Sequence, residues 1–165
     1  MRYAPGRSFP AYAYLPGRDA HPTRDPRGHS FGCPEEASSY LPREAWRENE
    51  DYLFGVDLYN HGYLWEAHEA WEGLWHAARH DALQASHLQG LIQCAAACLK
   101  VRMNQPRGLT RLAALGTSRL ESVAREHDGP FMGVNLVSWI REMRAFAASE
   151  PDSPEGRPTL DLGGG

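Results

Sequence analysis

The segment that most constrains the fold covers residues 83–103, because it is apolar on almost every side. Its centre reads GLIQCAAACL and contains no charged residue. A helix of this composition is stable in water only when other helices surround it. The segment therefore predicts a central helix, in which Cys94 and Cys98 are small buried side chains rather than disulfide partners or metal ligands.

Four further helices are predicted by apolar residues that recur at helical spacing. They cover residues 42–60, 63–80, 109–126 and 135–149. The connections between them are short, which makes consecutive helices antiparallel neighbours, and no segment alternates with a period of two residues. The sequence thus predicts an all-α fold, a single-domain bundle or array of about five helices.

The two ends of the chain differ from this helical domain of residues 43–149. Residues 1–42 are rich in Pro, Gly, Arg and aromatic residues and show no regular period. They are too apolar for a solvated tail, so we expect an extended N-terminal arm that docks on the body. Residues 150–165 have little to bury and much Pro and Gly, which predicts a disordered C-terminal tail.

Charge and hydropathy limit the partners and the location. The chain has 165 residues, 17 of them basic and 21 acidic, for a net charge of -4. No basic cluster is present, which argues against nucleic acid as a partner. No apolar run approaches the roughly 20 residues that span a bilayer, and the first residues lack the apolar core of a signal peptide. We therefore expect no membrane partner and a cytoplasmic location.

The segment DLYNHGYLWEAHEAWEGLWH, residues 57–76, concentrates the residues that can carry chemistry. His68 and Glu72 are four positions apart, so their side chains share one face of the second predicted helix. They border its apolar arc between Trp75 and Trp65, and we expect them to be partly buried. The motif is neither HExxH, as in zinc proteases, nor the paired Glu-x-x-His of di-iron bundles.

A metal held by this pair needs further ligands, because two neighbouring side chains cannot complete a coordination sphere. The arm offers His21 and His29, and His61 lies at the turn before the second predicted helix. Such a mixed set of nitrogen and oxygen donors suits Zn, Mn or Fe.

Several other polar side chains are expected around this site or further from it. A polar strip on the central helix, Gln89, Gln93 and Lys100, is expected to face the pair. Glu66 and Glu69 are expected to point further toward water, and His87 is expected at the surface.

The run DLYNHGYLWEAHEAWEGLW, followed by HLQGLIQCAAACLK, resembles the bacterial and archaeal domain-of-unknown-function family 309. The marker of that family is a His, three residues, a Glu, two residues and a Trp or Tyr, which here are His68, Glu72 and Trp75. The resemblance covers about residues 45–125. It implies an all-helical fold, a suspected metal site at the marker residues, and the label of a metal-dependent hydrolase without an established substrate.

Two functions are compatible with these residues. The first is a metal-dependent hydrolase of unknown substrate, in which a divalent metal held by His68, Glu72 and arm histidines activates water. Glu69 and Glu72 are then the catalytic carboxylates, and Trp65 and Trp75 border the substrate, an unidentified small molecule. The alternative is a non-enzymatic module that binds a protein partner or is purely structural, with His68 and Glu72 as a buried ion pair. A homodimer fits either function.

Overall fold

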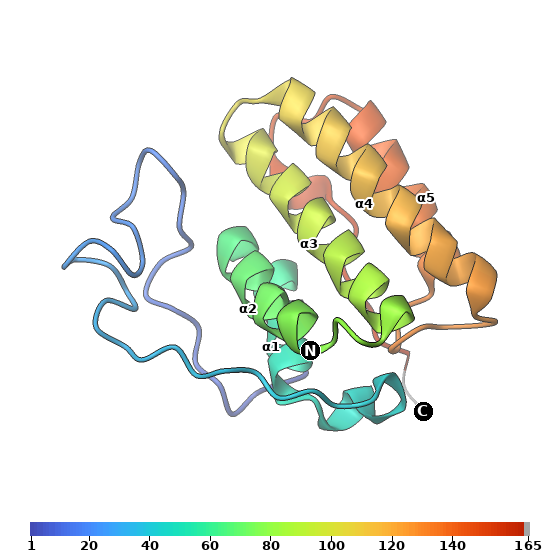
Figure 1. Ribbon diagram of the computed structural model, residues 1–165. Coiled ribbons are helices and arrows are strands. Elements are labelled where there is room, and N and C mark those ends of the chain that lie inside the picture. Colours follow the sequence, from blue (N-terminus) through green and yellow to red (C-terminus); the bar gives the residue numbers. More distant parts are fainter. Residues whose placement is uncertain (164–165) are drawn as a thin grey trace.

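The computed structural model describes residues 1–163, and in that range the regular elements are helices (Figure 1). The elements are η1 (Arg43–Glu48), α1 (Glu50–Asn60), α2 (Leu64–Ala77), α3 (Ala82–Arg102), α4 (Pro106–Glu126), α5 (Leu136–Ala148) and η2 (Pro154–Gly156), where η marks a 3-10 helix. The only β-pairing in these residues is two isolated bridges, Phe131 with Val134 and Val134 with Leu162. The all-α fold class is confirmed.

Helix α3 lies at the centre, between α2 on one side and α4 on the other (Figure 1). Its residues Leu88, Leu91, Cys94, Ala95 and Cys98 are buried almost completely. This is the central helix that the apolar sequence predicted. All three cysteines of the chain are free.

The helix starts follow local chemistry. The side chains of Asn49, Asp81 and Asn135 each accept a hydrogen bond from a backbone N–H in the first turn of α1, α3 and α5. Such N-caps satisfy donors that the helix itself leaves unpaired. The cap at Asn49 also explains why the first predicted helix, residues 42–60, is divided into η1 and α1: Asn49 has a non-helical backbone conformation.

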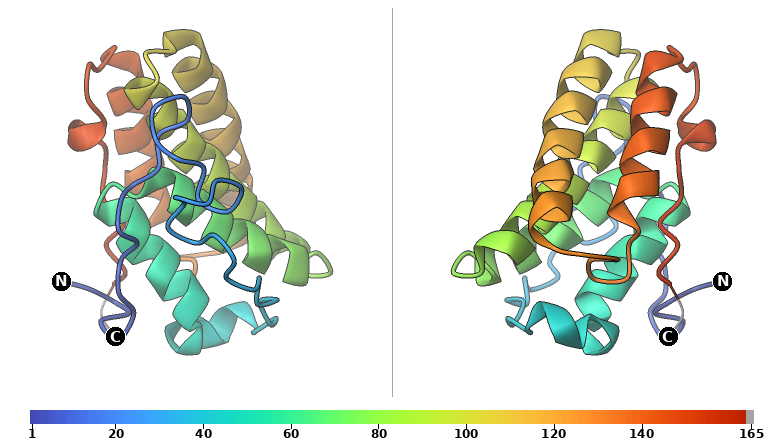
Figure 2. Two further views of the ribbon diagram at one scale, coloured as in Figure 1. Left: turned by 90° about the vertical axis from the view of Figure 1, so that its left-hand side faces the viewer. Right: turned by 90° about the vertical axis from the view of Figure 1, so that its right-hand side faces the viewer.

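The N-terminal arm lies against α1 and α2 (Figure 2). Its first turn is fixed by Asp57 of α1, whose carboxylate is completely buried. The carboxylate accepts hydrogen bonds from the backbone N–H groups of Tyr3, at 2.8 Å, and Ala4, at 2.9 Å, and pairs with Arg2 at 3.4 Å. A buried charge is stable only with such partners, so this end of the arm is firmly attached.

The C-terminal segment differs from the predicted disordered tail. Leu160 and Leu162 are 1% and 4% exposed, and Arg157 donates to the backbone oxygens of Tyr59 and Asn60 at the end of α1. The side chain of Asn60 also bonds both the N–H and the C=O of Leu160, at 2.8 and 2.9 Å. The prediction is therefore wrong for residues 150–163, because the open end of α1 supplies polar partners that composition does not reveal. Residues 164–165 lie outside the described residues.

The structure corrects the predicted position of His87. This residue was expected at the surface, but it is completely buried on α3, so the prediction is wrong. None of the helices formed by residues 1–163 is long and apolar enough to cross a membrane.

Candidate metal site

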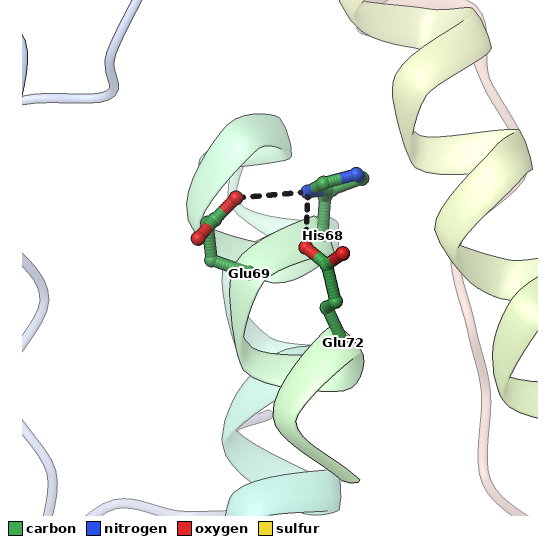
Figure 3. Close-up of side chains that lie close together, drawn as sticks. All are labelled: His68, Glu69 and Glu72. Carbon is green, nitrogen blue, oxygen red and sulfur yellow. Dashed lines mark ion pairs between the residues drawn. The ribbon is translucent and has the colours of Figure 1, made fainter. Parts of the chain in front are cut away.

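Three side chains on one face of α2 converge: His68, Glu69 and Glu72 (Figure 3). Nδ1 of His68 lies 3.2 Å from Oε1 of Glu69 and 3.9 Å from Oε2 of Glu72. One donor atom from each of the three residues lies within 4.8 Å of the other two. The helix itself places Glu72 beside His68, since residues four positions apart are neighbours, whereas adjacent residues are not. The side chain of Glu69, expected to point further toward water, bends back toward the same nitrogen.

The site is open to solvent on its carboxylate side. The side chains of His68, Glu69 and Glu72 are 29%, 47% and 43% exposed. Nδ1 of His68 is nevertheless shielded from solvent and makes no hydrogen bond within the described part of the chain. A shielded nitrogen that faces two carboxylates without hydrogen-bonding to either suits a shared cation, and imidazole with carboxylates suits Zn, Mn or Fe.

The structure does not bring the arm histidines to this cluster. Nδ1 of His21 accepts the backbone N–H groups of Thr23 and Arg24, both at 3.3 Å, within its own turn. Nδ1 of His61 lies 2.8 Å from the backbone oxygen of Asp57. Nδ1 of each ring thus has backbone partners, as is common for a histidine in a loop.

The third of these histidines, His29, is paired with Glu66. Its Nε2 lies 2.9 Å from Oε1 of Glu66, and the two side chains are only 4% and 5% exposed. The same carboxylate oxygen accepts the backbone N–H of Tyr14 at 2.8 Å. Glu66 therefore points toward the arm and not toward water as expected. Helical periodicity gives no signal for this contact, because the partners come from a loop without a period.

The polar residues of α3 do not form a strip beside the cluster. Gln93 accepts a hydrogen bond from Arg119 of α4 at 3.2 Å, and Lys100 donates to Gln105 in the turn before α4 at 2.9 Å. Both thus bond on the α4 side of α3, whereas the cluster lies on α2. Gln89 is half-buried on the same helix.

The two tryptophans flank the cluster along α2, and both are half-buried. Trp65 precedes His68 and Glu69 by about one turn, and Trp75 follows Glu72 by about one turn. The guanidinium of Arg79 lies 5.5 Å from the ring centre of Trp75. The flanks of the site are therefore aromatic.

Surface grooves of the molecule occur elsewhere. One lies between α4 and α5 and is lined by Thr110, Ala114, Thr117, Arg144 and Ala147. A second lies further along the same helix pair, next to the exposed Val137. Since α3 separates this helix pair from α2, these grooves do not belong to the cluster.

Comparison with known proteins gives one match. Residues 52–112 match the model of a family described as Domain of unknown function (DUF309), while no curated protein and no solved structure matches the chain. The matched range contains α2 and α3 entirely, and with them His68, Glu69 and Glu72. The resemblance seen in the sequence is confirmed over residues 52–112, where the chain is similar to the DUF309 family.

Proposed function

We propose that the protein is a metal-dependent hydrolase of unidentified substrate, whose divalent metal is held by His68, Glu69 and Glu72. The observation that supports this proposal is the shielded Nδ1 of His68, which faces two carboxylates and has no hydrogen-bond partner in residues 1–163. The ligand set is narrower than the sequence suggested, because it comes from one helix and includes no arm histidine.

Three protein ligands leave part of a coordination sphere open. A divalent ion held there would supply Lewis acidity, which polarises a carbonyl or phosphoryl oxygen and lowers the pKa of water. The chain's own residues have distinct tasks in this arrangement. His68, Glu69 and Glu72 hold the ion, and the second carboxylate oxygen of Glu69, the most exposed of the three, is placed to exchange a proton with a water molecule.

The surroundings of the cluster suit a substrate that is presented at the surface. The cluster is open on its carboxylate side, and Trp65 and Trp75 form apolar borders at its two ends along α2. Aromatic borders exclude water from one side of a bound group and leave the polar side to the ligands. A cytoplasmic location is part of the proposal, because three free cysteines suit a reducing compartment.

The alternative is a non-enzymatic helical module that binds a protein partner. It is favoured by the α4–α5 groove and by Val137 beside it, which is 74% exposed. The form of this alternative in which His68 and Glu72 are a buried ion pair is not supported, since both side chains are partly open to solvent.

Metal analysis of untagged protein, followed by melting with Zn, Mn, Fe and Mg salts, tests the proposal. We expect one ion per chain and, at a metal concentration about 100-fold above Kd, a rise of the melting temperature by roughly 5–10 °C. His68→Ala and Glu72→Ala should lose this rise. His76→Ala, an exposed histidine on the same helix, is the matched control and should keep it. An equal rise in His68→Ala would place the metal elsewhere and contradict the proposal.

A further inference from the structure

Residues 12–30 of the arm form a loop that is closed by its own hydrogen bonds. The hydroxyl of Tyr12 donates to the backbone oxygen of Ala20 at 2.6 Å and accepts the backbone N–H of His29 at 3.3 Å. The backbone N–H of Ser30 donates to the oxygen of Pro22 at 3.0 Å. The bond between Tyr12 and His29 joins the two ends of the loop, and the other two connect its middle to each end.

The polar attachment of this loop to α2 is concentrated on one carboxylate, that of Glu66. Oε1 of Glu66 is shared by the N–H of Tyr14 and by Nε2 of His29, while Oε2 is buried without a partner. Nδ1 of His29 is in turn 2.8 Å from the hydroxyl of Ser30. A carboxylate whose second oxygen is buried and unpaired is less stable than one that is fully hydrogen-bonded. The attachment at Glu66 is thus weaker than the one at Asp57.

The loop covers one aromatic side chain beside the cluster. The rings of Tyr14 and His21 stand edge-on to Trp65, with centroid distances of 5.1 and 5.7 Å and interplanar angles of 81° and 78°. Trp65 is one helical turn before His68 and Glu69, so the rings of the loop lie where a group bound next to these residues would reach. The cluster itself stays open.

We propose that residues 12–30 are an autoinhibitory strap, which occupies the face of Trp65 that an aromatic group of the ligand uses when it binds at His68, Glu69 and Glu72. The inference rests on the proposed function. Tyr14 and His21 stand in for the ligand's ring, and the His29–Glu66 contact is the latch. Release of the latch leaves the arm tethered at Asp57 and exposes Trp65.

The segment after the strap allows this movement. Residues 31–37 are all exposed, and Gly32 has a φ of 73°, a left-handed conformation that glycine adopts without strain. A hinge of this kind absorbs the change in backbone angles when a loop opens.

Limited trypsin digestion tests the latch. Arg18, Arg24 and Arg27 are exposed in the strap, but cleavage requires the loop to open. We expect His29→Ala to be cut at these three sites about tenfold faster than the unchanged protein. Thr23→Ala, an exposed residue of the same loop, is the control and should be cut at the normal rate. Equal cleavage rates in His29→Ala and the control would show that His29 is not a latch.

Ligand binding tests what the strap covers. The probes are benzohydroxamate, which has a metal-binding group and a ring, and acetohydroxamate, which lacks the ring, each titrated into zinc-loaded protein. His29→Ala should bind benzohydroxamate about three- to tenfold more tightly, the contribution of one aromatic pair, and acetohydroxamate unchanged. When Trp65→Ala is combined with His29→Ala, the gain in affinity for benzohydroxamate should disappear. His21→Ala removes one of the two rings from Trp65 without touching the latch, and should gain affinity for the ring without faster cleavage at Arg18, which lies outside the turn that His21 closes.

The outcomes separate the two proposals. If the protein binds zinc and acetohydroxamate but the ring adds nothing in His29→Ala or His21→Ala, the strap is wrong and the metal site stands. If the unchanged protein binds no zinc, the proposed function is wrong, and residues 12–30 then cover no ligand-binding site. A gain in His29→Ala that survives in the Trp65→Ala background would also overturn the inference, because the ring would then bind elsewhere.

Discussion

The hydroxyl oxygen of Tyr52 lies 3.2 Å from Nε2 of His87, and both side chains are completely buried. The hydroxyl donates its proton to the backbone oxygen of Met132 at 3.0 Å, so Nε2 of His87 is the donor toward Tyr52. Nδ1 of His87 is buried without a partner. Burial lowers the pKa of His87 to about 3. This neutral pair connects α1, α3 and the turn before α5.

The free energy of unfolding should decrease as the pH falls, because His87 is buried in its neutral form. An unfolded histidine has a pKa near 6.5, whereas the buried one stays neutral until about 3, so between these values the unfolded state binds the extra proton. Above pH 6.5 the neutral His87 does not lower the free energy of unfolding. As the pH falls from 6.5 toward 3, its burial lowers that free energy by about 1.4 kcal/mol per pH unit. Urea unfolding of the unchanged protein and of His87→Gln, at several pH values from 6.5 to 4.5, should show a shallower slope in the variant. His76→Gln, which alters an exposed histidine, should show the same dependence of unfolding free energy on pH as the unchanged protein. If His87→Gln also shows that same dependence, His87 is not the group responsible.

The C-terminal segment should stabilise the helical domain. Leu160 is 1% exposed, so Leu160→Ala should lower the free energy of unfolding by about 2–4 kcal/mol through lost burial and the cavity left behind. The neighbouring Thr159 is exposed, and Thr159→Ala should change it by less than about 0.5 kcal/mol. Chemical denaturation of the two variants measures the difference. If the C-terminal segment did not pack on the helical domain, Leu160→Ala and Thr159→Ala would change the free energy of unfolding by the same small amount.

The closest approach of α3 and α4 should not tolerate a methyl group. A Cβ on Gly116 would lie 2.6 Å from Sγ of Cys94 and 2.8 Å from the backbone oxygen of Gly90. Gly116→Ala should therefore destabilise the fold by about 1–3 kcal/mol, although alanine favours helices. In Gly108→Ala, on the same helix, the three atoms nearest to the new Cβ belong to the side chain of Lys100, which must shift but touches no backbone there, and the change should cost less than Gly116→Ala. Thermal melting compares them, and a stabilised Gly116→Ala would contradict the close packing.

Periodicity predicted the helices well but not their local ends. The apolar segment around Cys94 and Cys98 indicated the central helix because an all-round apolar surface has only one stable environment in water. The convergence of His68 with Glu72 also followed from spacing, since residues four apart on a helix are neighbours whatever surrounds them. The division at Asn49 was missed, because the cap depends on the backbone angles of a single residue.

The sequence by itself determined the helical class, the central position of α3 and the placement of His68 and Glu72 on one face, because these follow from interactions within a few residues. Only the tertiary structure decided that Glu66 receives His29, that Asp57 holds the first residues of the arm, and that Leu160 packs beside the end of α1. These contacts join positions 37 to 100 residues apart. Their partners are buried polar groups and chain ends, whose pairing depends on geometry in space and leaves no period in the sequence.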